Sequence, residues 1–290
     1  MKIIRSHAEL LVYRASLPAT STVGFVPTMG GLHAGHTSLL TLSRRDNDIS
    51  LASIFVNPAQ FAPGEDFASY PRTEDADLSL CASHGADAVY LPRAEDVYPA
   101  GYETYVEAGC GGAARNARSE GASRPTFFRG VATVVLKLAV AARPHRLYVG
   151  QKDAQQCAVV RAVVRDVGLP LEVVVGETVR EGDGLAMSTR NQYLTGAERS
   201  VAGGVWAALR EGTAVWAKGE RDAESVRGVV REKLADMRGK DANVEVLYVS
   251  LCDRESMREV EGTVEGGGKC VVCVAVMVGK ARLIDNVVLE

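Results

Sequence analysis

The sequence predicts an α/β protein, in which a doubly wound parallel sheet is followed by a smaller α+β domain. Up to Gly176, short runs that are apolar on both faces alternate with helical patterns. This alternation is typical of a parallel sheet that helices cover on both sides. After Gly176 the chain becomes polar and glycine-rich, and then gives two helical patterns and several β-like runs. We therefore expect a Rossmann-like domain over residues 1–178 and a smaller α+β domain over residues 179–290.

The elements of the first domain follow from their local patterns. The predicted strands are short runs rich in apolar residues, namely Thr22–Val26, Ile49–Val56, Asp87–Leu91, Arg146–Val149 and Leu171–Val175. The predicted helices are the longer segments between them, namely Gly35–Arg45, Thr73–His84, Val131–Ala142 and Ala154–Val167.

The second domain is predicted to contain two helices and three strands. A capping box at Thr195 and Glu198 predicts a helix that runs to about Lys218. A second helix after Asp222 carries one apolar face, made of Val226, Val229, Val230, Leu234 and Met237. The β-like runs are Val244–Val249, Cys270–Val278 and Ala281–Val288, and the tight turn between the last two predicts an antiparallel hairpin.

The composition is that of a globular protein and excludes several classes of partner. The chain has 290 residues, of which 47% are hydrophobic and 24% charged, and its formal net charge is −3. This balance gives no reason to expect a nucleic acid or an anionic membrane as partner. Charged residues interrupt the N-terminal segment before a signal peptide could form, and the longest apolar stretch, Val131–Ala142, is too short to span a membrane. We therefore expect a cytoplasmic protein.

Six cysteines are scattered along the chain, which is typical of reduced thiols; they are Cys81, Cys110, Cys157, Cys252, Cys270 and Cys273. Only Cys270 and Cys273 have the spacing of a metal motif. They lie in a predicted strand, where residues three apart face opposite sides. No second pair exists to complete four zinc ligands, so we expect ordinary core or surface thiols.

The segment PTMGGLHAGH, from Pro27 to His36, has the pattern of a phosphate-binding corner. A predicted strand runs into a glycine-rich turn and then into a helix, whose N-terminus offers N–H groups and a positive dipole to an anion. His33 and His36 are three apart, so both can point to the same side of the turn. They could instead be satisfied polar residues or zinc ligands, although no third ligand cluster is visible. The pattern resembles the H-x-G-H signature of the nucleotidyltransferase superfamily, which includes class I aminoacyl-tRNA synthetases.

Three further segments follow predicted strands or lie in the polar connection. Gln60 stands in the turn of SIFVNPAQF and could hold a hydroxy acid, although Asn-Pro is also a common turn pair. Lys152 comes directly after a strand and could neutralise a phosphate, whereas a solvated Lys-Asp pair at a helix start is the alternative. The segment MSTRNQYL places two hydroxyls and Arg190 in succession, which suits the β- and γ-phosphates, unless the loop is polar for no functional reason.

Taken together, the motifs resemble the pantothenate synthetase family. PTMGxLHxGH, SIFVNPxQF, YPR at Tyr70–Arg72, EGAxRP at Glu120–Pro125, GxKDxQQ and MSxRNxYL occur in the family's order, and ARLIDN at Ala281–Asn286 matches its carboxyl end. The resemblance extends from the first residues to the last. It implies ATP-dependent condensation of pantoate with β-alanine through a pantoyl-adenylate, with release of AMP and pyrophosphate, a requirement for Mg²⁺, and a homodimer.

The resemblance also implies roles for individual residues. His36 would be the catalytic histidine, assisted by His33, Lys152 and Arg190. Gln60 and Gln156 would hold pantoate, with Gln60 near β-alanine. The first domain would bind the nucleotide and pantoate, and the second would act as a lid. The ATP site would be lined by Met29, Gly30, Gly31, Leu32, His33, Ala34, Gly35, His36, Gly150, Gln151, Lys152, Asp153, Val179, Met187, Ser188, Thr189 and Arg190. The resemblance implies no set of protein ligands for the metal ion.

The chain departs from the family's usual pattern at a few positions. Where the family usually has Arg-Pro-Gly-His-Phe, this chain has Thr126 and Phe127 in place of the glycine and the histidine. Gln151 replaces the glutamate of Gly-Glu-Lys-Asp, and Thr189 replaces a serine but keeps the hydroxyl. The alternatives are another nucleotidyltransferase that acts on a phosphorylated substrate, a catalytically weak nucleotide-binding protein, and a zinc hydrolase that uses both histidines.

Overall fold

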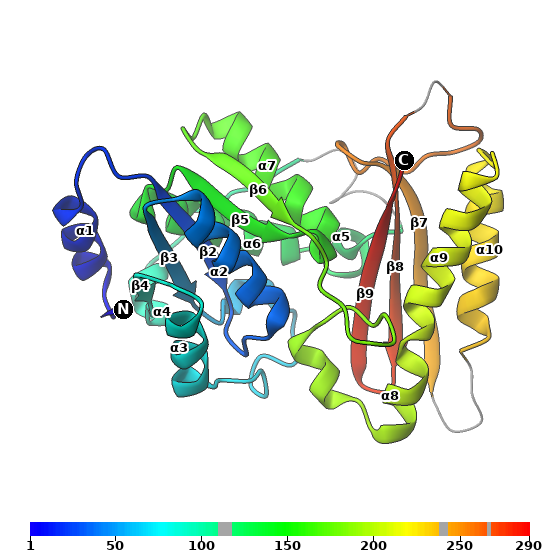
Figure 1. The fold of residues 1–290 in the computed structure, drawn as a ribbon, viewed down its shortest axis with the longest axis horizontal. Helices are drawn as coiled ribbons and strands as arrows, with labels where there is room; N and C mark the ends of the chain where they lie inside the picture. Colours follow the sequence, from blue (N-terminus) through cyan, green and yellow to red (C-terminus); the bar gives the residue numbers. More distant parts are fainter. Residues whose placement is uncertain (110–117, 238–242, 266–267) are drawn as a thin grey trace. The chain divides into compact units, whose positions relative to one another are not determined.

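The strands predicted in the first part of the chain form one parallel sheet. The computed structural model describes residues 1–109, 118–237, 243–265 and 268–290. The sheet has six strands in the order β1-β4-β3-β2-β5-β6, and each neighbouring pair is parallel (Figure 1). Its strands are β1 (Lys2–Ile4), β2 (Val23–Thr28), β3 (Ile49–Ile54), β4 (Ala88–Tyr90), β5 (Arg146–Gly150) and β6 (Glu172–Gly176). The predicted parallel sheet is confirmed, and β1 is an additional edge strand that the sequence pattern did not reveal.

The strand order reverses at β2. From β2 the chain adds β3 and β4 on one side, and then returns to place β5 and β6 on the other side. Strands β2 and β5 are therefore neighbours, with Phe25 paired to Leu147. In open parallel sheets, ligands bind beyond the carboxyl ends of the strands at such a switch point.

Helices cover the sheet on both faces, as the apolar character of the strands requires. Leu39 and Leu40 of α2 and Cys81 of α3 form a buried cluster with Val26 and Val89 of the sheet. Helix α6 packs against β2 and against α1. The helices are α1 (His7–Ser16), α2 (Ala34–Asp46), α3 (Glu74–Ser83), α4 (Ala94–Val97), α6 (Phe127–Ala142) and α7 (Ala154–Val167), with the short 3₁₀ turn η1 at Pro58–Gln60.

The chain divides into two units. The first contains residues 1–109, 124–150 and 159–177, and the second contains residues 178–290 together with two short segments from the first part of the chain, 118–123 and 151–158, as far as these ranges are described. The sequence pattern did not reveal the membership of these two segments. The functional division predicted between residues 178 and 179 remains a prediction.

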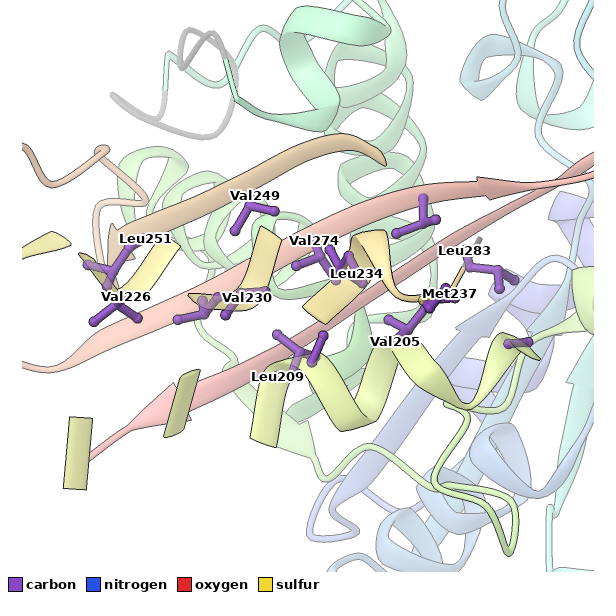
Figure 2. Packing of buried hydrophobic residues seen from close by; sticks show 14 of the residues in the cluster. Val205, Leu209, Val226, Val230, Leu234, Met237, Val249, Leu251, Val274 and Leu283 are labelled. Atoms are coloured by element: carbon purple, nitrogen blue, oxygen red, sulfur yellow. The ribbon is translucent and has the colours of Figure 1, made fainter. Parts of the chain in front are cut away.

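The second unit is built on an antiparallel sheet of three strands in the order β7-β8-β9, namely β7 (Val244–Asp253), β8 (Cys270–Val278) and β9 (Ala281–Leu289). The predicted hairpin between β8 and β9 is confirmed. Helices α9 (Gly204–Ala217) and α10 (Ala223–Ala235) pack on one face, where Leu209 and Leu234 meet Val274 (Figure 2). The opposite face carries Tyr248 and Arg282, which bind Glu120 of the short helix α5 (Glu120–Ser123).

The helix predicted from Thr195 to about Lys218 is two helices. The capping box at Thr195 and Glu198 is confirmed and begins α8 (Gly196–Ala202), but α9 starts only at Gly204. A Cβ atom at Gly204 would lie 2.6 Å from Cγ of Met237. Gly203, which ends α8, and Gly204 therefore allow a break between the helices and a close approach to Met237 that the apolar periodicity alone does not reveal.

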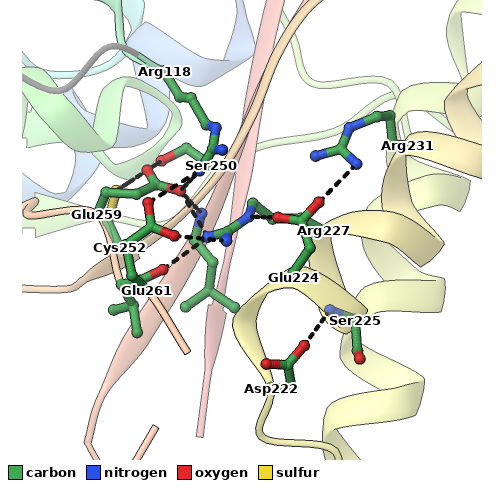
Figure 3. Close-up of polar contacts among 12 residues, drawn as sticks. Arg118, Asp222, Glu224, Ser225, Arg227, Arg231, Ser250, Cys252, Glu259 and Glu261 are labelled. Carbon is green, nitrogen blue, oxygen red and sulfur yellow. Dashed lines mark hydrogen bonds and ion pairs between the residues drawn. The ribbon is translucent and has the colours of Figure 1, made fainter. Parts of the chain in front are cut away.

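A buried arginine holds α10 against the segment that follows β7. Only 1% of the Arg227 side chain is exposed, and it bonds to Glu224, to Glu259 at 2.8 Å and to the Val260 carbonyl (Figure 3). Its guanidinium group is satisfied by anions and a carbonyl, as a charge with so little access to water requires. We interpret this cluster as structural.

The five described cysteines are buried and form no disulfide with one another, and Cys110 lies outside the described residues. In the part of the chain that the structure describes, no three His, Cys, Asp or Glu side chains gather as they would around a metal ion. Within the same ranges, none of the helices combines the length and apolar character that crossing a bilayer requires.

Candidate functional site

The glycine-rich corner lies at the carboxyl end of β2, in the first unit. Gly30 and Gly31 have φ values of 83° and 61°, in the left-handed region that favours glycine. A Cβ atom at Gly30 would lie 3.1 Å from both the Asp77 carboxylate and the Ile54 side chain. The backbone can therefore turn sharply from β2 into α2 only with glycine at these positions.

The two histidines of this corner bond to its backbone in a way that fixes their tautomers. His33 is the N-cap of α2, and its Nδ1 accepts a hydrogen bond from the Gly35 N–H at 3.1 Å. The Nδ1 of His36 accepts from the His33 N–H at 3.3 Å, and the two ring centroids are 4.1 Å apart. Since each Nδ1 is an acceptor, the proton of each neutral ring is on Nε2. Both imidazoles thus carry an Nε2–H donor.

A carboxylate that the motif does not contain holds the turn in place. Asp77 of α3 is 2% exposed and accepts hydrogen bonds from the N–H groups of Gly31 at 2.9 Å and Leu32 at 2.8 Å, and from the Thr73 hydroxyl at 3.1 Å. The sequence predicts N–H groups open to phosphate at the N-terminus of the helix, whereas those of Gly31 and Leu32, in the turn before it, bind Asp77. The signal that could have revealed it is its spacing. Asp77 lies four positions before Cys81, on the same face of the predicted helix, and an acidic residue on an apolar face needs buried partners.

Gln60 is held in a network of amide and hydroxyl groups in the same unit. The Asn57 Nδ2 donates to Gln60 Oε1 at 2.8 Å, and the Tyr98 hydroxyl donates to Asn57 Oδ1 at 2.7 Å. Burial raises the pKa of the Tyr98 phenol, so that it remains a donor. Because Asn57 uses the oxygen of the Gln60 amide, the Gln60 Nε2 is the group that can donate to a carboxylate.

One departure from the family pattern lies next to this network. The Phe127 ring lies 4.0 Å from the Arg124 guanidinium, in cation–π contact. Arg124 also binds the Gln60 carbonyl at 2.8 Å and both carboxylate oxygens of Glu65, at 2.6 and 2.7 Å. The phenylalanine that replaces the family's histidine therefore supports an arginine that holds the Gln60 turn.

The predicted lysine belongs to the second unit. Strand β5 ends at Gly150, and the 3₁₀ turn η2 (Gln151–Asp153) follows directly. Lys152 lines a cleft of the second unit together with Ser188 and Asp285; its other lining residues are Leu185, Ala186, Asn191, Val205, Leu283 and Ile284. The structure thus brings Lys152 and Ser188, which were predicted from separate motifs, into one cleft. Gln156 lies half-buried in the first turns of α7.

The segment Met187–Arg190 is anchored on both sides. The Met187 N–H donates to the Val179 carbonyl at 3.0 Å, and Ser188 caps the 3₁₀ turn η3 (Thr189–Tyr193) by accepting from the Arg190 N–H at 3.3 Å. Asn191 donates to Glu181 at 3.0 Å. The predicted loop is therefore a braced turn in this structure.

Arg180, whose backbone forms an isolated β-bridge with Ala186, takes part in a buried ion pair. Arg180 binds both oxygens of Asp285, at 2.6 and 3.0 Å, and its guanidinium lies 3.6 Å from the Trp206 ring centroid. Burial raises the pKa of Asp285, and the Arg180 charge lowers it by less. Neither residue was given a role in the sequence analysis, although Asp285 lies in the ARLIDN motif and Arg180 follows Val179.

The chain was compared with known proteins. The model of the pantoate-β-alanine ligase family matches residues 2–288. The chain belongs to this family. It is 48% identical to the pantothenate synthetase of Herpetosiphon aurantiacus and 44% identical to that of Chloroflexus aurantiacus; it aligns over its whole length with 100% and 99% of these relatives.

Solved structures of the family have the same fold. The structure of pantothenate synthetase from Thermus thermophilus has a TM-score of 0.89 at 40% identity, with 99% of each chain covered. A Francisella tularensis pantoate-β-alanine ligase, described as complexed with β-γ ATP and β-alanine, has a TM-score of 0.78 at 30% identity, covering 99% of this chain and 97% of that one. The predicted family, the α/β fold and the ligase activity that gives the family its name are confirmed.

Proposed function

We propose that the chain condenses pantoate with β-alanine at the expense of ATP, through a pantoyl-adenylate, and releases AMP and pyrophosphate. The observation that carries this proposal is the strand order. Strands β2 and β5 are neighbours at the switch point of the sheet, β2 leads into the histidine corner, and β5 ends immediately before the lysine turn. Nucleotides bind beyond the carboxyl ends of strands at such a point.

In the first step, an oxygen of the pantoate carboxylate bonds to the α-phosphorus of ATP, and the bond from this phosphorus to the pyrophosphate oxygen breaks. Two anions meet in this step, so donors and positive charge must be aimed at the transferred phosphate. We propose that His36 and Lys152 supply them there, and that His33 and Arg190 act on the departing pyrophosphate. The fixed Nε2–H donors of the histidines support this assignment.

In the second step, the neutral amine of β-alanine attacks the acyl carbon, the bond to AMP breaks, and the amine loses a proton. We propose that Gln60 and Gln156 hold pantoate for both steps. The network around Gln60 supports its role, because it leaves the Nε2 of this amide to donate to a carboxylate. The lid role of the second domain belongs to the same proposal, since the adenylate must be protected from water.

The remaining residues are proposed to line the ATP site; they are Met29, Gly30, Gly31, Leu32, Ala34, Gly35, Gly150, Gln151, Asp153, Val179, Met187, Ser188 and Thr189. Mg²⁺ is proposed to be held mainly by phosphate oxygens and water. A homodimer and a cytoplasmic location are proposed on the sequence resemblance and composition alone.

An AMP-release assay with ATP and Mg²⁺ tests the proposal, with pantoate and β-alanine omitted in turn. We expect AMP only when both are present, and exchange of pyrophosphate into ATP when pantoate alone is added. Exchange that requires a phosphate ester instead of pantoate would indicate another nucleotidyltransferase. ATP binding without AMP formation would contradict the ligase activity.

A further inference from the structure

Asn286 of β9 makes three hydrogen bonds to the turn that carries Lys152. Its Nδ2 donates to the carbonyls of Gln151 at 2.8 Å and Lys152 at 2.9 Å, and its Oδ1 accepts from the Gln151 Nε2 at 2.9 Å. Only 4% of Asn286 is exposed. Because backbone carbonyl oxygens can only accept, they fix the Nδ2 end of the Asn286 amide toward themselves.

These contacts determine the backbone conformation at Lys152. The Gln151 carbonyl belongs to the peptide group before the Lys152 Cα atom, and the Lys152 carbonyl belongs to the peptide group after it. Peptide groups are planar, so a bond to the oxygen of each plane restrains the two backbone dihedrals at that residue. One amide therefore restrains the direction in which the Lys152 side chain leaves the turn.

The Asn286 amide belongs to a paired strand of the second unit. Asn286 lies in the β8–β9 ladder opposite Cys273, and its own N–H donates to the Asp285 carboxylate at 2.8 Å. Asp285 in turn is paired with Arg180. A group that must place another to within about 0.5 Å works best when it is part of a packed strand.

We propose that Asn286 is a positioning residue of the reaction, which sets the place of the Lys152 ammonium by holding the two peptide groups that flank it. This inference rests on the proposed function, in which Lys152 acts on the transferred phosphate. Without the amide, the turn keeps its sequence but loses the bonds that fix its conformation. Misplacement of a reacting group by about 1 Å can lower a rate about a hundredfold.

The test is a double-mutant cycle with pantoate-dependent pyrophosphate exchange as readout, in wild type, Asn286→Ala, Lys152→Ala and the double variant. We expect Asn286→Ala to lower kcat by roughly tenfold to a hundredfold, with the KM for ATP changed by less than about threefold. In the Lys152→Ala background the same change should cost less than about threefold, since residues that act as a unit are not additive. An equal loss in both backgrounds would overturn the inference.

Matched controls separate positioning from a loss of stability. Asn47 is also a buried asparagine, 8% exposed, whose Nδ2 donates to the Ser43 carbonyl and the Tyr148 hydroxyl, both at 2.8 Å. It lies between α2 and the start of β3, at the amino ends of the sheet strands and not at their carboxyl ends. Asn47→Ala should lower the unfolding midpoint but leave kcat unchanged. If Asn286→Ala fails to fold, Asn286→Ser replaces it in the cycle, because the serine side chain is too short to reach both carbonyls.

The measurement on the wild type distinguishes failure of the proposed function from failure of the positioning role of Asn286. Absence of pantoate-dependent exchange in the wild type would contradict the proposed function. Normal exchange in the wild type and in Asn286→Ala would contradict only the positioning role.

Discussion

The histidine corner of the first unit and the lysine turn of the second unit are both held by one buried side chain from a distant part of the sequence, but with opposite polarity. At the histidine corner, the Asp77 carboxylate accepts from two backbone N–H groups. At the lysine turn, the Asn286 amide donates to two backbone carbonyls.

The difference shows which groups each region can offer to an anion. At the histidine corner, the N–H groups of Gly31 and Leu32 bind Asp77, so the donors that the turn presents are the imidazole Nε2–H groups. At the lysine turn, two carbonyl oxygens, which would repel a phosphate, face Asn286 instead. We call Asp77 and Asn286 the two clamps. Each clamp leaves the side-chain cation or donor as the group that acts on the ligand.

The largest expected effect is on the histidine corner. His36→Ala should lower kcat for pantoate-dependent pyrophosphate exchange at least about a hundredfold, the usual cost of losing one preorganised donor. His36→Asn keeps an acceptor for the His33 N–H but lacks the Nε2–H donor, so it should be as inactive as the alanine variant. Recovery of activity in His36→Asn would show that His36 only braces the corner.

The next effect concerns the stability of the second unit, where Arg180 pairs with Asp285 beside Asn286. Arg180→Ala leaves the buried Asp285 carboxylate without its cation, which should lower the free energy of unfolding by about 3 kcal/mol or more. Both tryptophans, Trp206 and Trp216, lie in the second unit, so urea unfolding can be followed there by fluorescence. Arg199→Ala is a control, because its partners Glu181 and Asp183 are more exposed. Equal losses in both variants would refute the importance of burial.

A smaller effect tests the carboxylate clamp. Asp77→Asn turns an NH₂ group toward one of the N–H donors of Gly31 and Leu32, and an unsatisfied buried donor costs about 1–3 kcal/mol. We expect a loss of kcat of about tenfold, because the corner becomes less ordered. Asp48→Asn is the control, since the Asp48 carboxylate accepts from the Thr22 N–H and hydroxyl before β2 begins. A normal kcat in Asp77→Asn would contradict the role of Asp77 in ordering the histidine corner.

The smallest pair of effects compares two helical glycines. A Cβ atom at Gly130 of α6 would lie 2.2 Å from the Ala59 carbonyl oxygen, next to Gln60, whereas Gly228 of α10 has nothing within 4 Å. Gly130→Ala should destabilise the protein by about 1–3 kcal/mol and raise the KM for pantoate. Gly228→Ala should stabilise it by about 0.5–1 kcal/mol. Thermal unfolding and steady-state kinetics of both variants measure these changes, and an unchanged KM in Gly130→Ala would contradict the close approach.

The sequence predicted local structural features well. The glycine-rich turn after β2, the place of Lys152 between a strand and a helix, and the cap at Thr195 depend on residues that are neighbours in the chain, and their patterns were visible. The partners of these segments were not visible, because Asp77, Tyr98 and Asn286 each lie more than 40 residues from the site groups that they bind. Their residue types have no fixed spacing to the groups that they bind.

The sequence by itself determined the alternation of strands and helices, the hairpin of β8 and β9, and the family, because these follow from periodicity, turn chemistry and ordered motifs. Only the tertiary structure decided that β2 and β5 are neighbours, that residues 118–123 and 151–158 join the second unit, and which side chains clamp each turn. The physical reason is that a buried hydrogen bond depends on the distance and direction between two groups, and these are set only when the separate elements pack.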